Sequence, residues 1–209
     1  MQNPWLKIPA QDYEGHMSAP HVAQLQFLND LFRQLLFEHK PEKILSAGCT
    51  TGNGFENIDF NVTNRVVGID INEEYLKIAR ERFSDKRIEF INDDVCTHDF
   101  GNQKFDLVHC ALVFEYVDVQ QCLNNLVMFL KDDGVLSVLL QLPSENHSIV
   151  SKTDYKSLES LGSIVKLVDV DLFRDLITKI GLREKSGKTI TLESGKCFYH
   201  GMYERVKSH

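Results

Sequence analysis

Three segments carry residues whose types and spacing favour ligand binding. The turn from Gly48 to Gly54 contains three glycines, and Asp70 follows it by about twenty residues. Asp93 and Asp94 come after a further short apolar run. Glycines let a ligand approach the backbone, and carboxylates accept hydrogen bonds from ribose hydroxyls or from the exocyclic amine of adenine. The three segments together predict a site for an adenosine-containing ligand.

Short apolar runs and amphipathic segments alternate along the chain and position these residues. The continuous apolar runs are typical of strands covered on both faces, and the amphipathic segments have helical spacing. Ser18, Asn72 and Asp118 are suited to cap three of the helices. Strands are predicted at 43–47, 65–70, 87–91, 105–110 and 135–142, helices at 18–39, 72–83, 118–130 and 170–180, and an antiparallel hairpin from 188–192 and 196–203.

This pattern predicts an α/β fold with a doubly wound, mostly parallel sheet of seven strands and an antiparallel C-terminal hairpin. In such sheets, ligands bind outside the carboxyl ends of the strands, near the point where strand order reverses. The three site segments all follow predicted strands. We therefore expect them to meet at one edge of the sheet.

The stretch from Ile44 to Leu142 resembles the core of class I S-adenosylmethionine-dependent methyltransferases, in particular the small-molecule branch of types 11 and 12. The resemblance implies a Rossmann-like methyltransferase fold and S-adenosylmethionine as the cofactor. It also implies one domain over 1–209, with a helical lid at 1–40, a cofactor-binding core at 41–143, and an acceptor-side insert and hairpin at 144–209. The similar motifs are residues 44–52, 67–72, 90–95, 105–117 and 130–134.

The same resemblance assigns cofactor-binding roles to particular residues. Asp70 would hold the ribose and Ile71 would lie against the adenine, whose edge Asp94 and Val95 would read. The glycine turn and the fourth strand would bind the remainder of the cofactor through Gly48, Cys49, Thr50, Gly52 and Cys110.

Two positions depart from the family pattern. Family members usually carry Asp or Glu in place of Ser46, and glycine in place of Thr50. The acid commonly orders the loop and the ammonium group of the ligand. Thr50 requires either a backbone angle that a side chain tolerates or a different loop path. These departures favour, as an alternative, a protein that binds the cofactor without catalysing transfer.

The predicted reaction is methyl transfer to a small-molecule acceptor by in-line displacement, which depends mainly on alignment and exclusion of water. No catalytic residue is assigned, because this chemistry does not require a dedicated base. Tyr13, His16, Tyr116, Gln141 and Tyr155 are candidates for the acceptor pocket. Simple helix packing is the competing interpretation for Tyr13 and His16.

Composition excludes several other classes of protein. The net charge of −7 and the lack of a long Lys/Arg cluster argue against a nucleic-acid partner. No apolar run reaches the length of a membrane span, and five scattered cysteines indicate reduced thiols and a cytoplasmic protein with no metal site. An NAD-dependent oxidoreductase is a further alternative, but the glycine spacing is wrong for a pyrophosphate turn.

Overall fold

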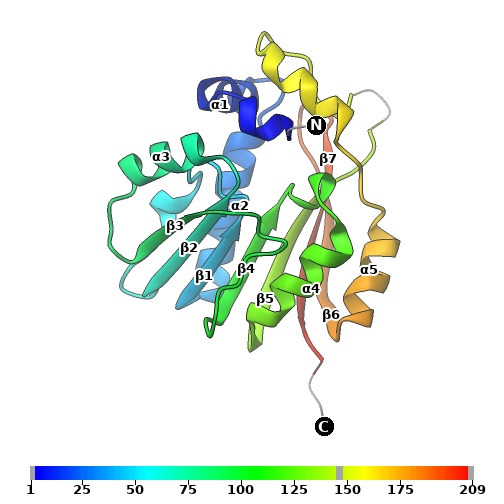
Figure 1. Ribbon diagram of the computed structural model, residues 1–209. Coiled ribbons are helices and arrows are strands. Elements are labelled where there is room, and N and C mark those ends of the chain that lie inside the picture. The colour runs from blue at the N-terminus through cyan, green and yellow to red at the C-terminus, as the bar shows by residue number, and fades with distance from the viewer. Residues whose placement is uncertain (1–2, 145–147, 207–209) are drawn as a thin grey trace.

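A seven-stranded sheet with the order β3-β2-β1-β4-β5-β7-β6 forms the centre of the molecule in the computed structural model, which describes residues 3–144 and 148–206 (Figure 1). Strands β1 to β5 are parallel, and β7 is antiparallel to both of its neighbours. The predicted fold class is therefore confirmed. The strands are β1 Lys43–Ala47, β2 Arg65–Asp70, β3 Ile88–Asn92, β4 Phe105–Ala111, β5 Leu130–Gln141, β6 Leu182–Thr191 and β7 Cys197–Arg205.

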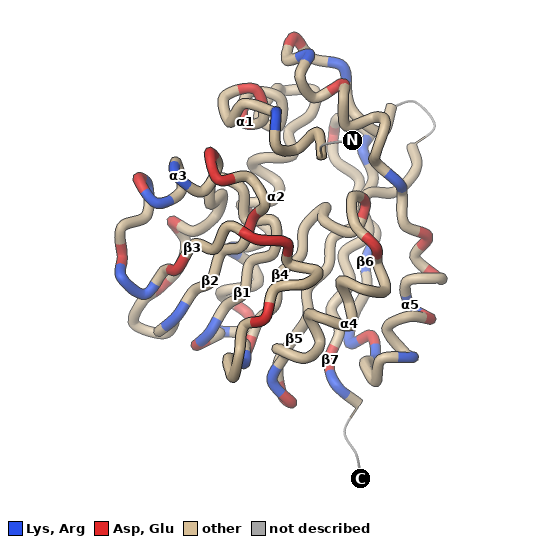
Figure 2. The backbone as a smooth tube through the Cα atoms, viewed as in Figure 1, with Lys and Arg blue, Asp and Glu red and all other residues tan. Residues whose placement is uncertain are grey.

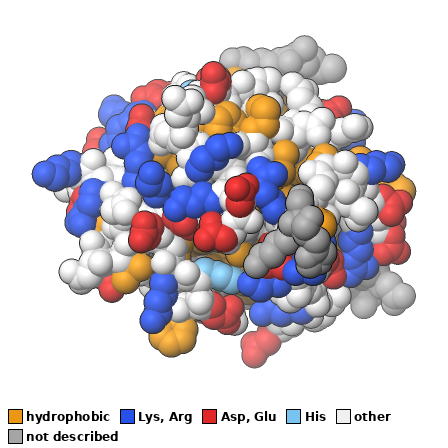
Figure 3. Space-filling view, turned by 90° about the horizontal axis from the view of Figure 1, so that it is seen from below, with side chains coloured by type: hydrophobic (Ala, Val, Ile, Leu, Met, Phe, Trp, Pro, Cys, Tyr) orange, Lys and Arg blue, Asp and Glu red, His pale blue; other side chains and the backbone are white. Residues whose placement is uncertain are grey.

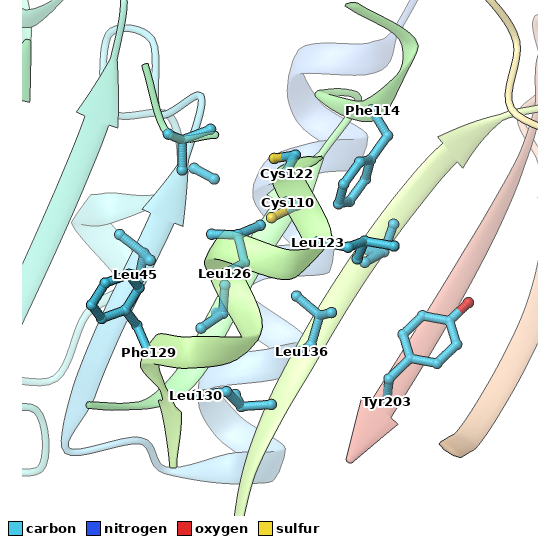
Figure 4. Packing of buried hydrophobic residues seen from close by; sticks show 14 of the residues in the cluster. Leu45, Cys110, Phe114, Cys122, Leu123, Leu126, Phe129, Leu130, Leu136 and Tyr203 are labelled. Atoms are coloured by element: carbon cyan, nitrogen blue, oxygen red, sulfur yellow. The ribbon is translucent and has the colours of Figure 1, made fainter. Parts of the chain in front are cut away.

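Helices cover both faces of this sheet, because alternate residues of each inner strand are apolar on both sides. On one face, Leu45 and Val108 pack with residues of α4 and α5, and Figure 4 shows Leu123 and Leu126 of α4 over the strands. On the other face, Ile44 packs with residues of α2 and α3. The α-helices are α1 Ala10–Ser18, α2 Gln24–His39, α3 Glu73–Arg82, α4 Val119–Phe129 and α5 Val170–Lys179.

The predicted caps of α3 and α4 are confirmed. Asn72 Oδ1 accepts hydrogen bonds from the amides of Glu74 at 3.0 Å and Tyr75 at 3.3 Å. Asp118 Oδ1 accepts from the amide of Gln121 at 2.8 Å. Both side chains satisfy amide groups that the first turn of a helix leaves without partners. The caps fix where each helix leaves the binding edge of the sheet.

The single helix predicted at 18–39 is wrong. The chain forms α1 and α2 with a break between them, and Ser18 is the last residue of α1 instead of a cap. Pro20 lies in the break, and Ala23 closes it with a φ of +50°. Proline has no amide hydrogen to continue the helical bonding of α1. The break lets α1 lie across the carboxyl ends of the strands while α2 packs against the sheet (Figure 1).

Strand β5 begins earlier than predicted, and Lys131–Gly134, which precede the predicted strand, are part of it. Leu130 pairs with Phe105 before a register shift in the β4–β5 ladder. Lys131 Nζ donates to Asp106 Oδ1 at 2.6 Å, which accommodates polar residues at this end of the strand. The predicted hairpin is confirmed, and β6 extends back to Leu182.

The outer surface carries both signs of charge. Figure 3 views the molecule from the side away from α1, where Lys and Arg side chains lie interspersed with Asp and Glu. Acidic positions gather in the loops that follow β2 and β3, beneath α1 (Figure 2). Among residues 3–144 and 148–206, no helix combines the length and apolar character needed to cross a bilayer.

Candidate cofactor and acceptor cavity

A large cavity lies between the carboxyl ends of the strands and a roof made by α1 and the 3₁₀ helix Lys156–Ser163. It encloses about 1150 Å³, including space open to solvent. The three polar segments singled out from the sequence all contribute to its wall. The residues that line it are Asn3, Trp5, Tyr13, His16, Met17, Gln24, Leu28, Gly48, Thr50, Ile69, Asp70, Ile71, Tyr75, Asp93, Asp94, Val95, Ala111, Leu112, Val113, Glu115, Tyr116, Val117, Gln141, Ile149, Val150, Leu158, Leu161 and Lys196.

The glycine turn after β1 has a left-handed backbone at several positions. Gly48 has a φ of +64° and Gly52 a φ of +82°, conformations that cost glycine little. Thr50 has a φ of +49°, so the departure from glycine leaves a threonine in the left-handed region. The amides of Gly48 and Cys49 donate to the carbonyl of Ile69 at 2.9 and 3.2 Å and hold the turn against β2.

Asp70 lies at the end of β2, with 9% of its surface exposed. Its Oδ2 accepts from the amide of Thr50 at 2.9 Å, and its Oδ1 accepts from the amide of Asn72 at 2.8 Å. Burial raises the pKa of this carboxyl to about 6, against the lowering effect of these bonds. A carboxylate has about four lone-pair sites, so these two bonds leave acceptor capacity for a ligand in the cavity.

The loop after β3 places Asp93, Asp94 and Val95 in the same wall. Asp93 Oδ2 pairs with His98 Nδ1 at 2.7 Å, and this contact lowers the pKa of Asp93. Asp94 Oδ1 accepts from the amide of Cys96 at 2.9 Å. Asp70, Ile71, Asp94 and Val95 thus lie along one side of the cavity.

Three of the predicted cofactor residues do not line the cavity. Cys110 has no exposed surface and packs beneath α4, where Figure 4 places its sulfur near that of Cys122. Cys49 packs into the opposite core layer with Phe55. A Cβ on Gly52 would lie 2.7 Å from the ring of Phe83, so this glycine allows a close approach within the protein. Cys110 lies on β4, where successive side chains point to opposite faces of the sheet, and its side chain points to the face that α4 covers.

Aromatic side chains form much of the roof. Trp5 meets Tyr116 edge-on at 5.1 Å between ring centroids and Tyr13 at 6.1 Å, and Tyr13 lies 5.5 Å from Tyr75. Burial raises the pKa of Tyr13 to about 12, so its phenol stays protonated near neutral pH. Tyr13 and Tyr116 are in the wall, as the acceptor-pocket prediction requires.

Hydrogen bonds tie α1 to segments distant in the sequence. Glu14 Oε1 accepts from Thr51 Oγ1 at 2.6 Å, and Glu14 also pairs with Arg82 of α3. His16 Nδ1 lies 2.9 Å from Thr153 Oγ1, and burial lowers the pKa of His16 to about 4. His16 and Gln141 line the cavity. Tyr155 does not, because its ring packs over Gly15.

Two buried charged residues of the cavity wall were not predicted from the sequence. Glu115 Oε1 accepts from the amide of Gln141 at 2.6 Å, and burial raises the pKa of this carboxyl to about 7. Lys196 Nζ donates to the carbonyl of Ile149 at 3.0 Å, and burial lowers its pKa to about 8. Glu115 closely follows the fourth strand, which was the available sequence signal. Lys196 follows a surface turn, where a lysine is usually solvated.

The donor and acceptor groups of the wall discriminate between ligand types. Asp70, Asp93 and Asp94 make one end acidic, which suits a cation rich in hydrogen-bond donors and disfavours the two negative charges of a pyrophosphate. S-adenosylmethionine carries a sulfonium, an ammonium, ribose hydroxyls and an adenine amine, so the residues present fit it. The described residues hold no group of three or more His, Cys, Asp or Glu arranged for a metal.

Comparison with known proteins points to a methyltransferase domain. Residues 45–138 match the family model described as a methyltransferase domain. The chain is 32% identical over 131 residues to malonyl-[acyl-carrier protein] O-methyltransferase of Acetivibrio thermocellus, covering 61% of this chain and 44% of that protein. It is 28% identical over 151 residues to the ubiquinone/menaquinone biosynthesis C-methyltransferase of Ectopseudomonas mendocina, and this match covers 67% of this chain and 59% of that protein. The chain thus spans about half the length of these curated relatives.

Among solved structures, N-methyltransferase NodS from Bradyrhizobium japonicum WM9, in complex with S-adenosyl-l-homocysteine, superposes with a TM-score of 0.70. The identity is 16%, and the match covers 99% of this chain and 100% of that one. This likeness establishes the fold, seven strands with the last two antiparallel, over nearly the whole chain.

Proposed function

We propose that this chain, which belongs to the class I S-adenosylmethionine-dependent methyltransferases, transfers a methyl group to a small-molecule acceptor held in the same cavity. The observation that carries the proposal is Asp70. This buried carboxylate stands where the glycine turn meets β2, and two backbone amides fix its orientation. In the proposal the chain is one domain, with residues 1–40 as lid, 41–143 as cofactor core and 144–209 as acceptor side.

The cofactor end would be formed by residues from three strand ends. Asp70 would accept hydrogen bonds from the ribose, Ile71 would cover one side of the adenine, and Asp94 with Val95 would face its edge. Gly48 and Thr50 lie at the turn, where the backbone is accessible to the rest of the ligand. Cys49, Gly52 and Cys110 would support this wall from behind.

When bound, the cofactor supplies an electrophilic methyl group on a sulfonium. The residues of this chain would position the cofactor and the acceptor and shield them from water. The aromatic side chains of Trp5, Tyr13 and Tyr116 would exclude water. The strand ends would orient the two ligands toward each other. No group in this scheme has to be a strong base.

Calorimetric titration of the full chain with S-adenosylmethionine, S-adenosylhomocysteine and NAD tests the cofactor assignment. We expect the first two ligands to bind and NAD to give no heat, because its pyrophosphate would lie among carboxylates. The variant Asp175→Asn, an exposed position on α5, serves as a control and should bind like the wild type. Binding of NAD in preference to both methionine derivatives would overturn the proposal.

A second measurement separates an enzyme from a silent binder. The cofactor with a tritiated methyl group is incubated with the chain and a panel of small phenols, carboxylic acids and amines. Transfer of label to a panel member supports catalysis. Thr50 is the observation that favours the alternative, since its left-handed backbone departs from the usual glycine. Cofactor binding with no transfer across the panel would support that alternative, a non-catalytic cofactor-binding protein.

A further inference from the structure

Two oppositely charged side chains are buried in one wall of the cavity without pairing with each other. Glu115 is 2% exposed and Lys196 is 3% exposed, and both line the cavity. Within residues 3–144 and 148–206, no carboxylate lies within 4.0 Å of the ammonium of Lys196. Buried charges are stabilised when they are paired. A ligand between these two groups would supply both partners.

The sheet order separates these residues from the proposed cofactor contacts. Asp70 ends β2 and Asp94 follows β3, on one side of β1. Glu115 follows β4, and Lys196 directly precedes β7, on the other side of β1. The cavity therefore has an acidic end above β2 and β3 and a second polar end above β4, β5 and β7.

Lys196 offers donors to an anion. Its ammonium has three N–H groups, and among the described residues its one recorded bond is to the carbonyl of Ile149 at 3.0 Å. His16, the other basic side chain of the wall, is neutral near pH 7 because its pKa is about 4. Lys196 is thus the cation available to a bound anion at this end.

Glu115 offers an acceptor to a hydrogen-bond donor. The amide of Gln141 occupies Oε1, whereas Oε2 is buried with no hydrogen-bond partner among the residues described. Leaving a buried polar atom unpaired destabilises the protein. A hydroxyl or amino group on the ligand would remove this cost.

Apolar residues form much of the remaining wall at this end. They come from α1, α2, the end of β4 and the loop after it, the segment after β5 and the 3₁₀ helix of the roof. Such a surface matches a hydrocarbon or aromatic body and gains free energy by covering it. The apolar residues are Met17, Leu28, Ala111, Leu112, Ile149, Val150, Leu158 and Leu161.

We propose that this end is the acceptor subsite and that it takes a small amphipathic carboxylic acid. The carboxylate binds Lys196, a hydroxyl or amino group donates to Oε2 of Glu115, and the apolar body lies against Leu112 and Leu158. That the bound acid is the methyl acceptor rests on the proposed function. Binding of the acid itself depends only on the residues of this wall.

Pairs of acids and their amides test the proposal: mandelate with mandelamide, hydrocinnamate with hydrocinnamamide, and octanoate with octanamide. Each is titrated into the full chain with and without saturating S-adenosylhomocysteine. For at least one pair, the acid should bind about tenfold more tightly than the amide, the usual advantage of a charged partner. Lys196→Met should reduce that preference to about twofold or less. Lys196→Arg and the surface control Lys188→Met should keep it.

Glu115 is tested with mandelate and its methyl ether, which lacks the donor hydroxyl. The wild type should prefer mandelate, and Glu115→Gln should lose that preference while melting temperatures report folding. The proposal is overturned if no acid outcompetes its amide, or if the preference persists in Lys196→Met. It is also overturned if Lys196→Met weakens S-adenosylhomocysteine binding tenfold, which would assign the lysine to the cofactor. Failure of the wild type to bind S-adenosylhomocysteine would contradict the proposed function alone, because the titrations without it still report on this subsite.

Discussion

Asp70 Oδ2 accepts the backbone amide of Thr50 at 2.9 Å, and this bond joins the end of β2 to the one non-glycine residue of the turn that has a left-handed backbone. The carboxylate therefore has two tasks. It holds the turn in shape, and it presents its remaining lone pairs to the cavity. A change at either residue will alter both the loop and the ligand site.

Replacement of Asp70 should weaken cofactor binding more than replacement of Asp93. Asp70→Ala removes a charged acceptor and releases the Thr50 amide, whereas Asp93 lies at the surface with His98 as its partner. Hydrogen bonds to charged groups contribute about 1.5–3 kcal/mol, so we expect a loss of about ten- to a hundredfold in S-adenosylmethionine affinity. Calorimetry on both variants measures it, and equal losses would mean that the ribose site is misplaced.

Thr50→Gly should stabilise the fold. A left-handed backbone costs a non-glycine residue about 1–2 kcal/mol, which glycine does not incur. We expect the melting temperature to rise by about 2–4 °C, the shift that 1 kcal/mol produces in a chain of this size. Differential scanning calorimetry checks it.

The matched control is Thr51→Gly at the next position. Thr51 Oγ1 donates to Glu14, and Thr51 does not have a positive φ, so this variant should melt at a lower temperature than the wild type. A rise for Thr51→Gly, or a fall for Thr50→Gly, would contradict the strain assigned to Thr50.

A buried His–Ser–His chain should make stability depend on pH. His109 Nδ1 lies 3.1 Å from Ser137 Oγ, which lies 3.0 Å from His200 Nε2. Burial lowers the pKa of His109 to about 3 and of His200 to about 4, below the unfolded value of about 6.5. The unfolded state then binds more protons as pH falls below about 6.5, so stability is complete above that pH and declines toward pH 4, by about 1.4 kcal/mol per pH unit for each histidine.

Urea unfolding of the wild type and of His109→Phe at pH 7 and pH 5 measures this effect. Phenylalanine keeps an aromatic ring beside Phe32, whose ring lies tilted against that of His109 at 5.2 Å between centroids. The variant should lose less stability between the two pH values, by about 1–2 kcal/mol. Identical losses in the two proteins would show that His109 titrates normally in the folded state.

Glu14 should control the attachment of α1. Glu14→Ala removes a hydrogen bond from the buried Thr51 and an ion pair with the partly exposed Arg82, and the ion pair contributes at most about 1 kcal/mol to global stability. We expect a small change in melting temperature, faster hydrogen exchange in residues 10–18, and weaker cofactor binding. The exposed Glu38→Ala on α2 is the control. Unchanged exchange in α1 would show that its other contacts hold it without Glu14.

Sequence patterns predicted the sheet well because each inner strand is apolar on both faces and most helices have a cap that acts locally. Asn72 and Asp118 are such caps. The break at Ala23 was missed because apolar spacing continues across it. That Asp70 and Asp94 lie in one wall was predictable because Asp70 ends β2 and Asp94 closely follows β3. Lys196 was not predictable, because only the antiparallel pairing of β7 with β5 brings a hairpin residue to the cavity.

The roof joins parts of the chain that are made at very different times. His16 meets Thr153, and Asp12 Oδ2 accepts a 2.6 Å hydrogen bond from Ser157 Oγ, so these contacts of α1 form only after residues 153–157 exist. During synthesis, α1 and the strand ends that carry Asp70 and Asp94 emerge before residues 153–157, so the cavity at first lacks that part of its roof. Lys196 arrives later still. A nascent chain on the ribosome would therefore display a groove open on that side, and the cavity wall would be complete only after residue 196 has been made.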